Sequence, residues 1–356
     1  MLNALRTDFT RTGVAAPLRV GIAVGIVLTV GSLIGHRDLA GFAALGALIS
    51  AFCRPDPYPV RALRLVSLGI GITVTIGVGA VVGAYSGTLP VEIAAISLLA
   101  GIAVYLLSML HIVGPGAVIF VFAATGAAGF ANTAADVRHA LVATVIGAFV
   151  GLAAALAPWL FINLPGRRRA PGPGPDTRSP SIWTGFAGGH DRDTHTHLIV
   201  TGVRVTAAAA ISAAIAAAVG LTHPMWAAMG AVASLQGVAY HLTVRRGMQR
   251  LLGNVGGALI AAALLALPLG YWGAVIAIVV FQTLAEILST VNYALCSLAV
   301  TPMALLLTGL GTGLPPAAAL DRVLDTLLGI VVAIAVAALT IRRGEVIEPD
   351  TDATAA

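Results

Sequence analysis

The sequence contains no lysine and little charge of either sign. Acidic and basic residues together make up 10% of its 356 residues, whereas soluble domains carry about 25%. Hydrophobic residues make up 58%, and the mean hydropathy is +0.96. This balance excludes a soluble globular protein. It predicts an all-α, polytopic membrane protein, because apolar runs long enough to cross a bilayer recur along the chain.

Motifs that carry enzymatic chemistry are also missing from the sequence. It has no Walker A loop, no HExxH pair and no nucleophile elbow. We therefore expect neither ATP hydrolysis nor any other enzyme activity, and no cofactor. The only two cysteines, Cys53 and Cys296, fall near helix ends that are predicted to be cytoplasmic, where a structural disulfide is not expected.

The apolar segments form two sets of six, which predicts about 12 transmembrane helices in two parallel repeats. Residues 1–164 are the N-terminal repeat, 165–197 a disordered cytoplasmic linker rich in Pro, Gly and charge, 198–343 the C-terminal repeat and 344–356 a disordered cytoplasmic tail. The segments 39–52 and 225–240 are short for a crossing of about 20 residues. Whether they span the membrane stays open.

Matching residues support the repeat. Four pairs align: Arg61 with Arg246, Asp38 with His223, Thr125-Gly126 with Thr308-Gly309, and Thr144-x2-Gly147 with Thr326-x2-Gly329. Six is an even number, so both repeats have the same orientation. They are then related by an axis along the membrane normal, and a translocation path is expected near their interface.

Arginine placement predicts the orientation. With the N-terminus inside, most arginines fall in cytoplasmic loops, as the positive-inside rule requires. We therefore expect a bacterial inner-membrane protein with both termini in the cytoplasm. The basic pI does not point to nucleic acid, because the arginines stand at helix ends. The linker residues His190, Asp191, Asp193, His195 and His197 lack a recognised ligand spacing, so no metal site is predicted.

Glu286 is the sharpest candidate for function. It lies inside an apolar segment, about one turn from its predicted cytoplasmic end. An ionised carboxylate in hydrocarbon costs several kcal/mol, so Glu286 should face a cavity, pair with a cation or be protonated. A proton-coupling role and a helix-end glutamate that pairs with a nearby arginine are both open interpretations.

Two further groups could bind a substrate. Arg246, Arg250, Gly253 and Gly257 are three or four residues apart and share one helix face. The two guanidinium groups could attract an anion or only set the topology, while the glycines allow close helix packing. Arg322 and Asp325 are three residues apart and can pair, either at a substrate entrance or as a local ion pair.

Several of these motifs resemble one family. His223-Pro224-Met225-Trp226, Arg246-x3-Arg250-x2-Gly253-Asn254-x2-Gly257, Asn292-Tyr293-Ala294-Leu295, Thr301-Pro302 and Arg322-x2-Asp325-Thr326-x2-Gly329 are similar to the fusaric acid resistance protein-like (FUSC) family of aromatic acid exporters. The resemblance is specific over 198–341 and diffuse in the first half. The chain departs from the family at Asn254, where threonine is usual, and in its much shorter linker.

The resemblance implies a proton-coupled secondary transporter that exports aromatic or other organic acids. Together with the residues themselves, it leads us to expect substrate-binding or coupling roles for Glu286, Arg246, Arg250, Asn254, Arg322, Asp325 and Pro302. Arg246 and Arg250 would collect the anion, and Glu286 would carry the proton. The expected partners are the lipid bilayer, a small organic anion and protons, with a homo-oligomer left open. Two alternatives remain: a passive organic-anion channel, and a non-transporting membrane scaffold of envelope assembly.

Overall fold

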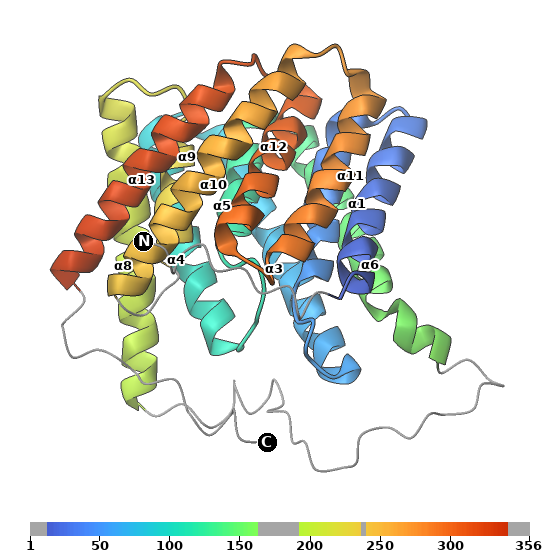
Figure 1. The fold of residues 1–356 in the computed structure, drawn as a ribbon, viewed down its shortest axis with the longest axis horizontal. Coiled ribbons are helices and arrows are strands. Elements are labelled where there is room, and N and C mark those ends of the chain that lie inside the picture. The colour runs from blue at the N-terminus through green and yellow to red at the C-terminus, as the bar shows by residue number, and fades with distance from the viewer. Residues whose placement is uncertain (1–12, 163–191, 236–239, 341–356) are drawn as a thin grey trace.

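The computed structural model describes residues 13–162, 192–235 and 240–340, and this part of the chain is helical without a β-strand (Figure 1). The first half contains α1 (Ala15–Leu33), α2 (Arg37–Ala47) continued by the 3-10 helix η2 (Leu48–Ala51), α3 (Tyr58–Tyr85), α4 (Leu89–Met109), α5 (Val118–Phe130) and α6 (Ala134–Ile162). The second half contains α8 (Arg192–Ala218), α9 (Pro224–Ser234), α10 (Tyr240–Ala266), α11 (Gly270–Leu288), α12 (Tyr293–Thr312) and α13 (Ala318–Thr340). The predicted all-α membrane fold is confirmed.

Helix length separates these elements into two kinds. In the described part of the chain, nine helices are long and apolar enough to cross a membrane. Their outward faces carry large apolar side chains such as Ile70, Leu259 and Ile276, as expected of a surface in contact with lipid. α2 and α9 have 11 residues each and rise only about 16 Å, too little for a hydrocarbon core of about 30 Å. The two segments predicted to be short are therefore short helices.

The two short helices are packed inside the bundle. α9 buries every residue from Met225 to Ser234. α2 packs against α6, and α9 packs against α13 in the same way. A methyl group on Gly147 would overlap the carbonyl oxygen of Ala43, and one on Gly329 would overlap that of Ala227. These equivalent contacts support the predicted match of Thr144-x2-Gly147 with Thr326-x2-Gly329.

The predicted match of Asp38 with His223 does not hold as a match of structural positions. Asp38 lies in the first turn of α2, whereas His223 is the N-cap of α9. The glycine contacts pair Ala43 with Ala227, and relative to them α2 begins about one turn earlier than α9.

The two repeats meet along reciprocal contacts. α1 packs against α11, and α8 packs against α4, so the first helix of each repeat meets the fourth helix of the other (Figure 1). Gly21 lies against Thr283 in one contact, and Gly101 lies against Thr206 in the other. At both contacts, a glycine of the first repeat thus packs against a threonine of the second.

Parts of the predicted linker and tail lie outside the described residues, which do not include 163–191 and 341–356. α8 begins at Arg192. The last residues assigned to the linker, 192–197, are therefore helical and continue into the first helix of the second repeat.

Candidate functional site

A cavity of about 400 Å³ lies between the two repeats. Its walls come from α2 and α5 of the first repeat, from α9 and α12 of the second, and from the start of α4. Ligand pockets commonly have volumes of about 300–1,000 Å³. The cavity is at the end of the bundle where α9 begins and α12 ends, which is the end predicted to face away from the cytoplasm.

Equivalent positions of the two repeats face this cavity. Phe42 and Trp226 precede Ala43 and Ala227, the residues that the glycine contacts pair, and both rings line the cavity. Thr125 of α5 and Thr308 of α12, predicted repeat partners, also line it. Each repeat thus contributes one aromatic ring and one hydroxyl group.

The titratable groups in the cavity wall are Asp38, Glu92 and His223. The His223 ring stacks on Trp226 with centroids 4.0 Å apart and an interplanar angle of 9°. Its Nδ1 lies 3.7 Å from Asp321 Oδ2. Burial lowers the pKa of His223, and Arg322 lowers it further against the opposing effect of Asp321. His223 is therefore held toward its neutral form.

Arg322 connects this wall to the interior of the second repeat. Its guanidinium carbon lies 5.1 Å from the centroid of the Trp226 ring, a cation–π arrangement. Its Nη1 lies 3.9 Å from the sulfur of Met229. Asp325 is fully buried, yet in the described part of the chain neither of its carboxylate oxygens has a hydrogen-bond partner. The predicted pairing of Arg322 with Asp325 is not among the ion pairs between described residues.

A buried polar ladder joins α10, α12 and α13. Asn254 donates from Nδ2 to the carbonyl oxygen of Arg322 over 3.0 Å, and its Oδ1 lies 3.0 Å from Thr301 Oγ1. One turn earlier on α10, the carbonyl oxygen of Arg250 accepts from Ser297 over 3.2 Å. Asn254 therefore connects all three helices.

The arginines of α10 gather around one tyrosine. Arg250 donates from Nη1 to the Tyr293 hydroxyl over 3.2 Å, and the guanidinium carbon of Arg246 lies 4.4 Å from the centroid of the same ring. Arg250 is buried. Tyr293 begins α12 at the end predicted to be cytoplasmic, so both guanidinium groups lie near that end.

The glycine face of α10 is used for packing. A methyl group on Gly253 would overlap the carbonyl oxygen of Ala294, and one on Gly257 would lie 2.6 Å from that of Leu298 and 3.2 Å from Pro302 Cδ. Pro302 lies inside α12 and leaves the Leu298 carbonyl without its helical donor. The structure therefore gives Pro302 a packing position against α10, and it does not line the cavity.

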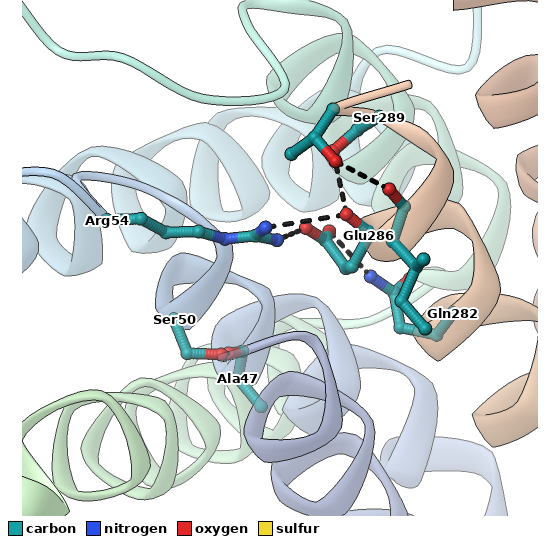
Figure 2. A network of polar contacts seen from close by, with 8 residues as sticks. Ala47, Ser50, Arg54, Gln282, Glu286 and Ser289 are labelled. Atoms are coloured by element: carbon teal, nitrogen blue, oxygen red, sulfur yellow. Dashed lines mark hydrogen bonds and ion pairs between the residues drawn. The ribbon is translucent and has the colours of Figure 1, made fainter. Parts of the chain in front are cut away.

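Glu286 lies apart from this ladder and contacts the first repeat (Figure 2). Its carboxylate forms an ion pair with Arg54, which also donates to the Glu286 carbonyl oxygen over 3.4 Å. Gln282 donates to Glu286 Oε1 over 3.0 Å from the preceding turn. Glu286 is thus paired with an arginine of the first repeat.

The backbone after η2 positions Arg54. Phe52 is extended, and Cys53 takes the left-handed region with φ 56° while its N–H donates to the Val113 carbonyl over 2.8 Å. This turn brings Arg54 to the end of α11, as Figure 2 shows. Sequence reasoning missed Arg54, because only the arginine-rich character of its loop was visible.

The described residues contain no group of three or more His, Cys, Asp or Glu side chains that could hold a metal ion. Asp193, His195 and His197 of the former linker cluster are in α8, and His190 and Asp191 lie outside the described part.

Comparison with known proteins adds to this description. The model of the family described as "Fusaric acid resistance protein-like" matches residues 209–336. That range contains every residue predicted for substrate binding or coupling. A relative, the "Uncharacterized membrane protein YvaC" of Bacillus subtilis (strain 168), is 30% identical over 141 residues. No solved structure matches the chain.

The match with the relative covers 40% of this chain and 22% of the relative, so the chain spans about a fifth of that protein's length. The relative is a membrane protein, and the described helices are those of a membrane protein. Over residues 209–336, this membrane protein therefore carries the sequence pattern of the fusaric acid resistance protein-like family, as its motifs predicted.

Proposed function

We propose that this protein is a secondary transporter that exports organic acids across the bacterial inner membrane. The observation that carries the proposal is the cavity between the repeats, where Phe42 faces in from one repeat and Trp226 from the other. Transporters built from repeats bind their substrates at the repeat interface, next to interrupted helices. The short buried helices α2 and α9 are elements of this kind.

The charges along the bundle fit an anionic substrate. Arg246 and Arg250 lie near the predicted cytoplasmic end and attract an anion, because guanidinium groups match carboxylate geometry. Arg322 provides a third positive charge beside Trp226. At the other end, Asp38 and Glu92 line the cavity and favour release of an anion. Two aromatic walls suit a flat, amphipathic organic acid.

The contact between Arg54 and Glu286 supplies a coupling device. It joins the repeats at the predicted cytoplasmic end, whereas the cavity lies toward the opposite end. Protonation of Glu286 removes the charge that holds Arg54, so proton binding and separation of the repeats are linked at this contact. This arrangement supports proton coupling through Glu286. The cytoplasmic location of both termini is proposed from the distribution of arginines.

Uptake of a radiolabelled aromatic carboxylate into inverted membrane vesicles tests the proposal, with and without an imposed proton gradient. We expect gradient-dependent accumulation, lost in Glu286→Gln and reduced at least tenfold in Trp226→Ala. Trp272→Ala is the matched control, because Trp272 is exposed on α11 outside the cavity and its loss should leave uptake unchanged.

Other outcomes would overturn parts of the proposal. The membrane potential alone drives a monovalent anion outward by about 2.3 kcal/mol per 100 mV. Downhill flux indifferent to the proton gradient and to Glu286→Gln would therefore indicate a passive anion channel. No flux for a panel of aromatic and aliphatic carboxylates would contradict transport.

A further inference from the structure

Asp325 lies on α13 one turn after Arg322, next to the polar ladder, and its carboxylate has no hydrogen-bond partner in the described part of the chain. Its side chain is 0% exposed, and neither carboxylate oxygen has a hydrogen-bond partner. The hydroxyl of the adjacent Thr326 is buried without a partner as well. Buried polar groups are nearly always hydrogen-bonded, so this pair of residues calls for an explanation.

An ionised carboxylate at this buried position would destabilise the folded protein. Removing a carboxylate from water without donors costs several kcal/mol, and the usual response is neutralisation. A bound sodium ion is a poor alternative, because a hard cation of this kind needs several oxygen ligands. Among the described residues, Asp325 belongs to no group of three or more His, Cys, Asp or Glu side chains that could hold a metal ion. Protonation neutralises the Asp325 carboxylate without a set of coordinating oxygen atoms.

The side chain of Arg322 has two possible partners, Asp325 and Trp226. Arg322 precedes Asp325 by three residues on α13, a spacing at which side chains can pair. In the structure its guanidinium group instead lies over Trp226 and next to Met229. A neutral Asp325 explains this choice, since the ionised carboxylate would attract the guanidinium group away from the indole ring.

We propose that Asp325 is a proton-binding site and that its protonation decides whether Arg322 lies over Trp226 or pairs with Asp325. The arrangement in the structure, with Arg322 over Trp226, is the one expected of the protonated state. Loss of the proton draws Arg322 off Trp226 and changes the wall of the cavity between the repeats. The assignment rests on the proposed function only in treating that cavity as the transport site.

Other charged groups lie near Asp325, and their effects on Trp226 must be distinguished from its own. Asp321 and Arg322 lie on α13 itself, Arg250 lies on α10, and His223 precedes α9 and stacks on Trp226. Of the helices packed on α13, α8 contributes Arg204, which bonds to Thr340 at the far end of α13. His223 stacks on the Trp226 ring and also titrates, so its effect on Trp226 must be distinguished from that of Asp325.

Fluorescence of Trp226 tests the proposal in the full chain reconstituted in liposomes. The other tryptophans are replaced by phenylalanine (Trp159→Phe, Trp183→Phe and Trp272→Phe), and emission is followed from about pH 5 to about pH 10, where perturbed carboxyl and imidazole groups titrate. We expect a transition that persists in His223→Gln, Asp321→Asn and Glu286→Gln, is lost in Asp325→Asn and is retained at a shifted pH in Asp325→Glu.

The result that would overturn the proposal is a transition unchanged by Asp325→Asn, or no transition with Asp325 in place once His223 is replaced. Asp325→Asn removes a buried ionisable group, and its folding is checked by a monodisperse profile on gel filtration. If that variant does not fold, Asp325→Glu decides, because only a titrating side chain at this position moves the midpoint. The readout requires no transport, so its failure and the failure of the proposed function are distinguishable.

Discussion

Arg54 and Glu286 join the two repeats by an ion pair although they stand 232 residues apart in the chain. The carboxylate side chain is 8% exposed and the guanidinium side chain 21%. This difference in exposure determines how well the remaining charge is solvated after each substitution. Without Arg54, a buried carboxylate loses its counter-charge, whereas without the carboxylate Arg54 can still reach water.

Arg54→Ala should therefore destabilise the protein more than Glu286→Gln. Breaking a buried ion pair from one side costs about 3–5 kcal/mol, and we expect Arg54→Ala near the lower end because its side chain is partly exposed. A glutamine at 286 still accepts from Gln282 and should cost less. Thermal unfolding in detergent measures both, and an equal loss in the two variants would contradict the asymmetry.

Gly329→Ala should be severely destabilising, because the added methyl group overlaps the backbone of α9 at Ala227. Overpacking of this kind costs about 1–3 kcal/mol or more, and backbone atoms cannot move aside as a side chain can. Gly126→Ala is the matched control, since nothing lies within 4 Å of its added methyl group. Similar unfolding temperatures for the two variants would show that the α9–α13 contact is looser than described.

Asn254→Ala should lower stability by about 1–3 kcal/mol, the cost of leaving buried polar groups without partners. It removes the donor to the Arg322 carbonyl and the acceptor near Thr301. A threonine in Asn254→Thr is too short to bridge all three helices, so we expect only partial recovery of the stability that Asn254→Ala loses. Chemical denaturation in mild detergent compares the three proteins. An Asn254→Ala variant as stable as the wild type would contradict a stabilising role of the polar ladder.

Stability should fall on acidification in part because of His223. Its pKa is lowered in the folded protein, so the folded state binds fewer protons here than the unfolded state. The resulting stabilisation is present above the unfolded pKa of about 6.5 and is lost as pH falls toward the folded value. Unfolding temperatures of the wild type and His223→Gln, measured across this range, should converge at acid pH. Parallel curves would contradict this sign.

The sequence predicted the helices, their division into two repeats and the two short segments, because these depend on apolar runs that are local in the chain. It did not predict that Asn254, Thr301 and the Arg322 backbone meet, because these contacts depend on how α10, α12 and α13 pack. The pairing of Glu286 with Arg54 could not be predicted, since it depends on how the repeats dock. The sequence also did not pair Phe42 with Trp226. The predicted match of Arg61 with Arg246 places the repeats 185 positions apart and so pairs Phe42 with Ala227. The glycine contacts pair Ala43 with Ala227 instead, one residue away.

Reversible cross-linking across the repeats tests the account most directly. Arg54→Cys and Glu286→Cys are combined in a background with Cys53→Ala and Cys296→Ala, and a short bis-methanethiosulfonate reagent bridges the two thiols. Transport of the labelled carboxylate is then measured before bridging, after it, and after reduction. The account predicts that bridging abolishes the exchange of labelled for unlabelled carboxylate, which needs no net proton movement, and that reduction restores it. The reagent should leave each single-cysteine variant at its own untreated rate. Undiminished exchange with complete bridging would contradict the claim that the repeats separate at this contact during transport.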